Sequence, residues 1–121
     1  MKQTRVIIID SEKREVREGT VSSLEDCQKL VGGLIERAGY LITNDEVFVN
    51  EEGLMGQPKH FFMFQGGHSP VAGNGYITGP TDSKGNETDC TLSLEQAYRK
   101  IKFLDINTVA LVAQLRGDSE E

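Results

Sequence analysis

The sequence predicts a single α+β domain over 1–121, with a small mixed or antiparallel sheet and two main helices. Three observations carry this prediction. The chain has 121 residues, which is the size of one ordinary domain. Residues 4–10 contain a β-branched run that is typical of a buried strand. Two later segments, 24–38 and 94–104, carry apolar residues at the spacing of an amphipathic helix.

The remaining strands are expected to be short and bounded by turn residues. We expect them over 16–21, 40–43, 46–50, 76–78 and 88–92. The first of these would pair with residues 4–10 through the polar SEKRE connection. Asn44–Asp45 would join the next two strands, and the Gly/Asn-containing segment DSKGNETD would join the last two. This pattern predicts three hairpins along the chain.

The first helix is the most clearly patterned element in the sequence. Ser22 or Ser23 offers an N-cap, and Gly39 supplies a natural stop. The internal pair Gly32 and Gly33 lowers helix stability by about 1 kcal/mol per glycine relative to alanine. We therefore expect another backbone or a ligand to come close to the chain at this pair.

The C-terminal part of the chain is predicted to be helical at first and then less defined. Ser93 is a suitable N-cap for the second helix. The apolar segment 106–115 is too short for periodicity to decide between a strand and a helix. We expect an ordered core over about 4–115 and a frayed tail over 116–121.

The charge of the chain excludes several classes of protein. Thirteen Lys and Arg against nineteen Asp and Glu leave a net charge of −6. Binders of duplex nucleic acid or anionic membranes need a basic face, which this balance does not favour. No window approaches the ~18 consecutive apolar residues that span a bilayer, and the N-terminal apolar run is too short for a signal peptide. We therefore expect a cytoplasmic protein that contacts neither duplex nucleic acid nor membrane.

The cysteines and histidines predict neither a disulfide nor a metal centre. Cys27 and Cys90 lie 63 residues apart without a CxxC spacing, and cytosolic thiols rarely pair. His60 and His68 do not complete a standard zinc spacing with them. We expect two reduced, half-buried thiols and no cofactor.

The stretch 53–81 differs from the rest of the sequence. Its 29 residues contain no Asp or Glu, although they hold both histidines, all three prolines and seven of the thirteen glycines. Long Gly-rich loops in small domains are often functional. Glycine N–H groups can approach phosphate, aromatic rings can stack on a base, and Lys or His can supply positive charge. The stretch therefore predicts a site for a small anionic, nucleotide-like ligand.

The candidate ligand-binding residues comprise cations for phosphate, rings for a base, polar side chains for its edges and residues at the rim. They are Asn50, Gly53, Gln57, Lys59, His60, Phe61, Phe64, His68, Asn74, Tyr76, Thr78, Arg99 and Lys102. The last two lie outside the stretch and could complete the phosphate contacts across a subunit boundary. We name no catalytic residue.

Other interpretations of the same stretch stay open. Phe61–Phe64 are typical of a core or an interface, and a stretch free of acids also suits a self-association surface or a plain structural loop. Glu51 and Glu52 near His60 could do acid–base chemistry, but adjacent strand residues point to opposite faces. From the aromatic stretch and the apolar C-terminal segment we expect a homo-oligomer.

Several segments together resemble a known family. They are LVGGLIE at 30–36, VFVNEEG at 47–53, the Gln57–Pro58 pair, GNGYITG at 73–79 and the turn GNETD. This order is similar to DUF3846, a domain of unknown function carried largely by phages, plasmids and other mobile elements. The resemblance spans about 5–104, and it implies no settled activity. The segments HFFMF and GGHSPVAG, and the tail after Leu104, depart from the family pattern.

The resemblance implies a mobile-element setting, in which small proteins often act against host defence without catalysis. We expect the protein to sequester a nucleotide-like host immune signal. The alternative is a protein-directed inhibitor or a DNA mimic that acts on a host defence protein. A DNA mimic needs a contiguous acidic face, whereas the acids here are spread over both halves of the chain.

Overall fold

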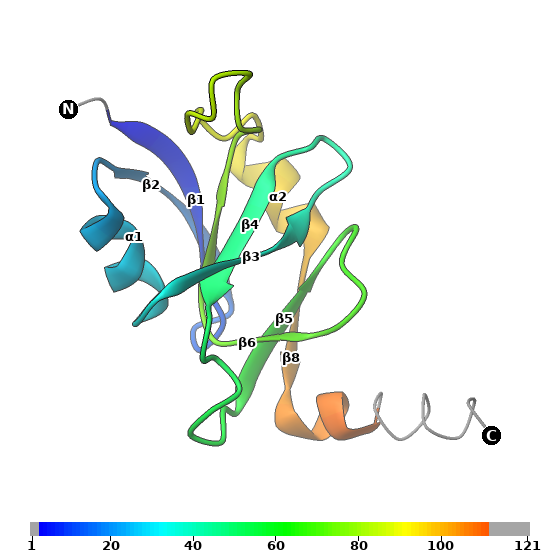
Figure 1. The fold of residues 1–121 in the computed structure, drawn as a ribbon. Helices are drawn as coiled ribbons and strands as arrows, with labels where there is room; N and C mark the ends of the chain where they lie inside the picture. The colour runs from blue at the N-terminus through cyan, green and yellow to red at the C-terminus, as the bar shows by residue number, and fades with distance from the viewer. Residues whose placement is uncertain (1–2, 112–121) are drawn as a thin grey trace.

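In the computed structural model, residues 3–111 form two antiparallel sheets and three short helical segments (Figure 1). The elements are β1 (Thr4–Asp10), β2 (Glu15–Val21), α1 (Leu24–Val31), β3 (Ile35–Tyr40), β4 (Glu46–Asn50), β5 (His60–Phe64), β6 (Val71–Ala72), β7 (Gly75–Thr78), α2 (Leu94–Lys100) and β8 (Ile101–Asp105). Residues 106–111 form the third helical segment. The predicted α+β class is confirmed. None of the helices within the described residues is long and apolar enough to cross a bilayer.

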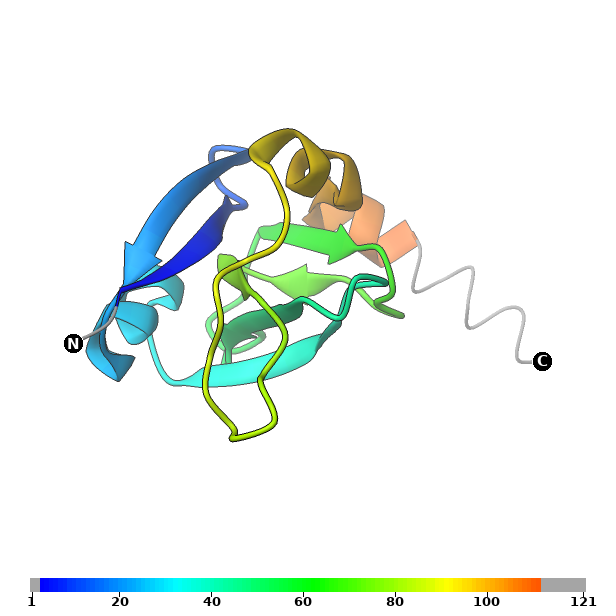
Figure 2. The ribbon, with the colours of Figure 1, turned by 90° about the horizontal axis from the view of Figure 1, so that it is seen from above.

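The larger sheet has the strand order β2-β1-β7-β4-β3, and the smaller one has the order β6-β5-β8. β7 lies between β1 and β4 and pairs with both, so it joins the β1–β2 hairpin to the β3–β4 hairpin. The smaller sheet packs against one face of the larger sheet, and α1 covers the other face (Figures 1 and 2).

Strand periodicity divides the core into two layers. Ile7 and Ile77 point toward the smaller sheet and α2, where they pack with Phe62 in the main cluster. Val6 and Tyr76, one position earlier in β1 and β7, point toward α1 and pack in a second cluster. The expectation that the phenylalanine-rich segment belongs to the core is confirmed, because Phe62 is fully buried and Phe61 is 3% exposed.

The first predicted helix is wrong beyond Val31. Gly32 has φ 80°, a left-handed conformation that ends the helix, and the N–H groups of Gly32 and Gly33 both donate to the Gln28 carbonyl. Residues 35–40 form β3 instead, because antiparallel pairing with β4 satisfies their backbone. Ser23, and not Ser22, is the N-cap. At Gly33 the close neighbour is a side chain, and not the backbone or ligand that was expected: a Cβ atom there would lie 2.9 Å from the Asn50 Nδ2 atom.

The second predicted helix is also shorter than expected. Ser93 caps it with a complete capping box, but the helix ends at Lys100 and residues 101–105 form β8 against β5. No strand forms over 88–92, because this segment crosses the end of β1 with single backbone contacts such as Cys90 N–H to the Arg5 carbonyl at 2.9 Å. The predicted strand at 40–43 is likewise wrong after Tyr40, where a turn leads into β4.

The stretch 53–81 is not one long loop, because it contains β5, β6 and β7. Aromatic and β-branched residues give these strands enough apolar surface to fill the core between the sheets. In the apolar C-terminal segment, residues 106–111 are helical, and Asp105 caps them by accepting from the Thr108 N–H at 2.8 Å. The expectations for 112–115 and for the tail 116–121 lie outside the described residues.

Candidate functional site

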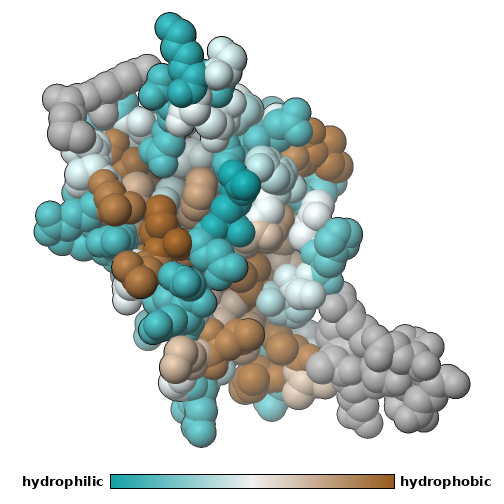
Figure 3. Space-filling view, in the orientation of Figure 1, coloured by the Kyte–Doolittle hydropathy of each residue, from teal (hydrophilic) through white to brown (hydrophobic). Residues whose placement is uncertain are grey.

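One surface pocket brings together three of the residues that the sequence singled out. It measures about 540 Å³ and lies between the turn before β5 and the helical segment 106–111. Its lining is Leu54, Gln57, Pro58, Lys59, Phe61, Ile106 and Val109. We call it the Lys59 pocket. Figure 3 shows apolar side chains gathered at this lower end of the molecule.

The strand period of β5 decides which candidates share the pocket. Lys59 and Phe61 are two positions apart and line it together, whereas His60 between them does not. Phe61 forms the floor, where its ring packs with Leu104 of β8 and Ala72 of β6. The pocket therefore pairs a fixed aromatic floor with a cation at the rim.

The turn that leads into β5 has an unusual backbone. Gln57 has φ 57°, one of three non-glycine residues with positive φ among those described. A glutamine in this region is strained, and such strain persists where surrounding structure holds it. The other two residues, Arg14 and Asn44, lie in the β1–β2 connection and in the turn before β4. Gln57 instead lies at the rim of the Lys59 pocket.

The electrostatics of the pocket depend on one side chain. Lys59 is exposed and forms no ion pair with the residues that the structure describes. Asp105 is the carboxylate at the base of the helical wall. Hydrogen bonds from Thr108 hold its pKa below the usual value, so it is ionised and committed to capping. The Lys59 ammonium is thus available for an anionic group.

Three other candidates do not line the Lys59 pocket, and two of them are buried. Tyr76 is fully buried and stacks on Phe48 with ring centroids 5.2 Å apart. Thr78 is 1% exposed, and its hydroxyl donates to the Gly79 carbonyl at 3.1 Å. Asn74 accepts from the Ser11 N–H at 2.9 Å, which ties two loops together. Tyr76 and Thr78 have structural contacts because the strand predicted at 76–78 is a central strand of the larger sheet, and Asn74 lies in the loop directly before it.

The remaining candidates line neighbouring hollows or lie elsewhere. Asn50 and Gly53 line a pocket of about 230 Å³, which also contains Glu51 and Glu52 but not His60. The Asn50 amide donates to the Val31 carbonyl at 3.2 Å, so it braces α1 against β4.

Phe64 and His68 line a third hollow of about 290 Å³. Arg99 pairs with Glu95 at 2.6 Å on α2, and Lys102 lies on β8 opposite Met63. Neither basic residue lines the Lys59 pocket.

The thiols behave as expected of reduced cysteines. Cys27 and Cys90 are both free and buried, more deeply than the half-buried state expected. Burial raises the pKa of the Cys90 thiol to about 11. Within residues 3–111, no group of three or more His, Cys, Asp or Glu side chains is placed to hold a metal ion.

The sequence reasoning missed the apolar walls of the Lys59 pocket. Leu54 is 75% exposed in a polar turn, and Ile106 and Val109 face it from a helical segment that the sequence left undefined. It also missed a cavity of about 580 Å³ between α1 and the 82–88 loop. An exposed leucine in a turn is a weak signal for the first, and no local pattern predicts the second.

Comparison with known proteins places the chain in a family. A model of the domain of unknown function DUF3846 matches residues 1–102. The chain belongs to the DUF3846 family. No curated protein and no solved structure matches it. The match ends before the helical segment 106–111, so one wall of the Lys59 pocket in this DUF3846 protein lies outside the matched region.

Proposed function

We propose that this DUF3846 protein binds a small anionic, nucleotide-like molecule in the Lys59 pocket without turning it over. The Lys59 ammonium would pair with the anionic group, and the Gln57 amide would contact a polar edge. The planar part of the ligand would lie against Leu54 and Phe61. The observation that carries this proposal is a lone cation beside an aromatic floor in an otherwise apolar pocket.

The size and charge of the pocket support this ligand class. A volume of about 540 Å³ falls within the range of small-molecule sites, which are mostly apolar with a few placed polar groups. Lys59 is the one charged side chain among the described residues that line it. A cation next to apolar walls interacts more strongly with an anion than one surrounded by water does.

Binding without turnover would make the protein a sequestering agent. The family resemblance implies a mobile-element setting, and there a host immune nucleotide is the ligand class that such a protein would remove from circulation. The proposal needs no general acid or base in the pocket, and the pocket lining supplies neither a histidine nor a carboxylate.

A second candidate function is binding to another protein, including a second copy of this chain. The observation that favours it is the exposure of apolar side chains in the two segments that form the pocket walls, where Leu54 is 75%, Met55 71% and Ile106 42% exposed. Contiguous exposed apolar side chains of this kind mark many protein interfaces. A host defence protein as the partner would correspond to the inhibitor alternative.

The test compares a nucleoside monophosphate with its uncharged nucleoside. Thermal unfolding and isothermal titration would use AMP and adenosine as matched probes, after native mass spectrometry of the purified protein has reported any retained ligand and the oligomeric state. We expect AMP to bind more tightly than adenosine. Lys59→Gln should weaken AMP binding about threefold to tenfold, and it should leave adenosine binding unchanged.

The matched control is Lys84→Gln, which removes an exposed lysine from the 82–86 turn away from the pocket. Its AMP affinity should equal that of the wild type. The ligand proposal is wrong if neither probe binds at millimolar concentration and the protein carries no small molecule. A single host protein recovered with it at fixed stoichiometry would then support the second candidate.

A further inference from the structure

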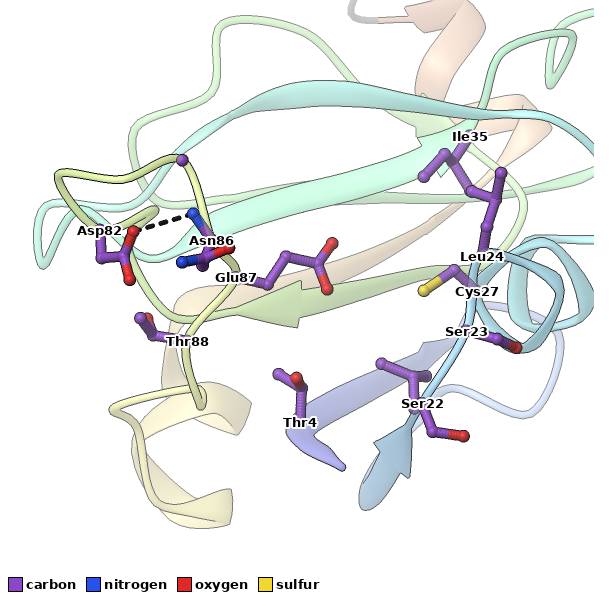
Figure 4. Close-up of a pocket in the computed structure, with 12 residues that line it drawn as sticks. Thr4, Ser22, Ser23, Leu24, Cys27, Ile35, Asp82, Asn86, Glu87 and Thr88 are labelled. Carbon is purple, nitrogen blue, oxygen red and sulfur yellow. Dashed lines mark hydrogen bonds between the residues drawn. The ribbon is translucent and has the colours of Figure 1, made fainter. Parts of the chain in front are cut away.

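A second cavity, at the opposite end of the larger sheet, has a chemistry different from that of the Lys59 pocket. It measures about 580 Å³ and lies between the start of α1, the adjoining ends of β1 and β2, and the 82–88 loop (Figure 4). Val21, Leu24, Cys27 and Ile35 give it an apolar side. Hydroxyl, amide and carboxylate groups from the loop form the other side. We call it the Glu87 cavity.

Glu87 is an exposed residue whose carboxylate lines this cavity. Figure 4 shows its side chain extending from the loop toward Leu24 and Cys27. It makes no hydrogen bond or ion pair with any residue within 3–111. Because Glu87 lies close to Cys27, its negative charge, together with burial, raises the pKa of the Cys27 thiol.

The neighbouring carboxylates, in contrast, already have partners. Asp82 accepts from the Lys84 and Asn86 N–H groups at 2.9 and 2.8 Å, which shapes the loop. Asp26 accepts from the N–H and the hydroxyl of Ser22 at the start of α1. Of these three acids, Glu87 is therefore the one whose carboxylate has no hydrogen bond or ion pair with the described residues and is available to a ligand.

Arg5, which follows the lining residue Thr4 in β1, already has partners. The Arg5 guanidinium donates to the Cys90 and Leu92 carbonyls and pairs with Glu18 at 3.0 Å. Lys84 lies on the exposed turn of the loop and does not line the cavity. Among residues 3–111, the charged side chains that line the cavity are Asp82 and Glu87, both acidic.

The lining of the cavity continues into the core through Cys27. The Cys27 thiol lines the cavity, and the hydroxyl of the fully buried Tyr76 lies beside this thiol under α1. Tyr76 itself does not line the cavity.

The apolar side of the cavity limits the ligand further. Leu24 is 60% exposed although it begins α1 on the cavity side, and Ile35 continues this apolar surface from β3. A ligand that covers both residues removes their side chains from water, which favours binding in proportion to the apolar area buried. A hydrated metal ion would leave this surface uncovered. An organic molecule with one positive charge fits both sides of the cavity.

We propose that the Glu87 cavity binds a small organic cation, an amine with an apolar body, whose ammonium group pairs with Glu87 while its body covers Leu24 and Ile35. This site is separate from the Lys59 pocket and has the opposite charge preference. All the residues that line it fall within the region matched by the DUF3846 model.

Three probes of similar shape test the proposal. Phenethylamine carries the cation, phenethyl alcohol is its neutral counterpart, and 3-phenylpropionate is an anionic one. Titrations followed by amide NMR spectra should show the amine shifting the signals of residues 22–24 and 85–88. The alcohol should bind at least about threefold more weakly, since it lacks the ion pair, and the anion should not bind there.

Matched variants connect the effect to the carboxylate. Glu87→Gln should weaken amine binding about threefold to tenfold and leave alcohol binding unchanged. Glu12→Gln, on the exposed β1–β2 connection, removes the same charge from the chain and should leave amine binding unchanged. Leu24→Ala should weaken both the amine and the alcohol, because it shortens the apolar wall.

Three outcomes would overturn the proposal. The first is equal binding of the amine and the alcohol, and the second is an affinity that Glu12→Gln lowers as much as Glu87→Gln. The third is a set of amine-shifted signals confined to residues outside the cavity. None of these outcomes bears on the Lys59 pocket, because its probes are anions and its variant is Lys59→Gln.

Discussion

The turn at 41–45, together with Glu46 at the start of β4, lies before this strand, and the turn at 51–57 follows it. The two regions differ in which side chains they bury. The first turn buries two acids, with Asp45 fully buried and Glu46 2% exposed. The second exposes apolar residues, with Leu54 and Met55 both more than 70% exposed. Normal partitioning would place the acids outside and the apolar residues inside.

The buried acids are tolerated because their carboxylates accept several hydrogen bonds, most of them from a distant segment of the chain. Asp45 accepts from the N–H and the hydroxyl of Thr91, and from the Thr43 hydroxyl at 2.6 Å. Glu46 accepts from the N–H and the hydroxyl of Thr81, and pairs with Arg37 at 3.0 Å. The two carboxylates thereby anchor the 78–92 segment to the larger sheet.

The comparison separates structural from functional residues. Polar groups that are buried and fully paired hold the fold together, and their loss leaves partners unsatisfied. Apolar groups that remain exposed add little to the stability of the isolated chain, and they are available to bind. Substitutions of the buried acids should therefore lower the stability of the fold, whereas substitutions of the exposed apolar residues should weaken binding. Three experiments test this difference.

The largest effect is expected for Asp45→Ala. This substitution leaves the Thr91 N–H and two hydroxyls without their acceptor, so unfolding in urea should show a loss of about 3 kcal/mol. Glu12→Ala, at an exposed acid, is the control and should change stability by less than about 0.5 kcal/mol. Similar losses in both variants would show that Asp45 does not anchor the segment.

A smaller and pH-dependent effect is expected for Glu46→Gln. Burial acts to raise the pKa of Glu46, but hydrogen bonds from Thr81 and Arg37 hold it below the ordinary value of 4.5. The unfolded chain therefore takes up this proton at a higher pH than the folded chain, and the stabilisation is present above about pH 4.5. It is lost as the pH falls through the pKa of the folded state.

Urea unfolding of the wild type and of Glu46→Gln at several pH values measures this difference. At pH 7 the wild type should be more stable by about 1–2 kcal/mol, the size of a hydrogen bond to a charged group. The difference should shrink as the pH falls below 4.5. A difference that is constant from pH 7 to pH 3 would contradict the assigned role of the carboxylate.

The smallest effect on stability is expected for Leu54→Ser. Because this side chain is 75% exposed, its replacement should change the free energy of unfolding by less than about 0.5 kcal/mol. It should nevertheless weaken any binding at the Lys59 pocket, measured by titration with AMP or by the concentration dependence of the sedimentation coefficient. A large stability loss with unchanged binding would show that Leu54 serves the stability of the fold and not binding.

The sequence correctly predicted the elements that depend on residues close together in the chain. The β-branched run in β1, the caps Ser23 and Ser93, and the strand β4 all follow from neighbouring residues. The helix predicted through Ala38 failed because apolar residues at 34 and 35 continue the helical spacing beyond Gly32. There the left-handed glycine and the pairing of β3 with β4 outweighed periodicity.

The candidate site was predicted only in part for a related reason. Lys59 lies directly before β5 and Phe61 is the second residue of β5, so their proximity in the chain was sufficient to bring them together. Tyr76 and Thr78 lie on a central strand, and their burial depends on β1 and β4, which are distant in the sequence. The buried role of Asp45 depends on Thr91, 46 residues away, and no local pattern reports such a contact.

The position of β7 also has a consequence for the order of folding. The β1–β2 and β3–β4 hairpins close short loops, whereas β7 must pair with β1 about seventy residues earlier in the chain. Closing long loops is slow, so we expect both hairpins to form before the strand that joins them. During synthesis, the inner edges of β1 and β4 stay unpaired until residue 78 leaves the ribosome, which makes this interval the one most exposed to aggregation.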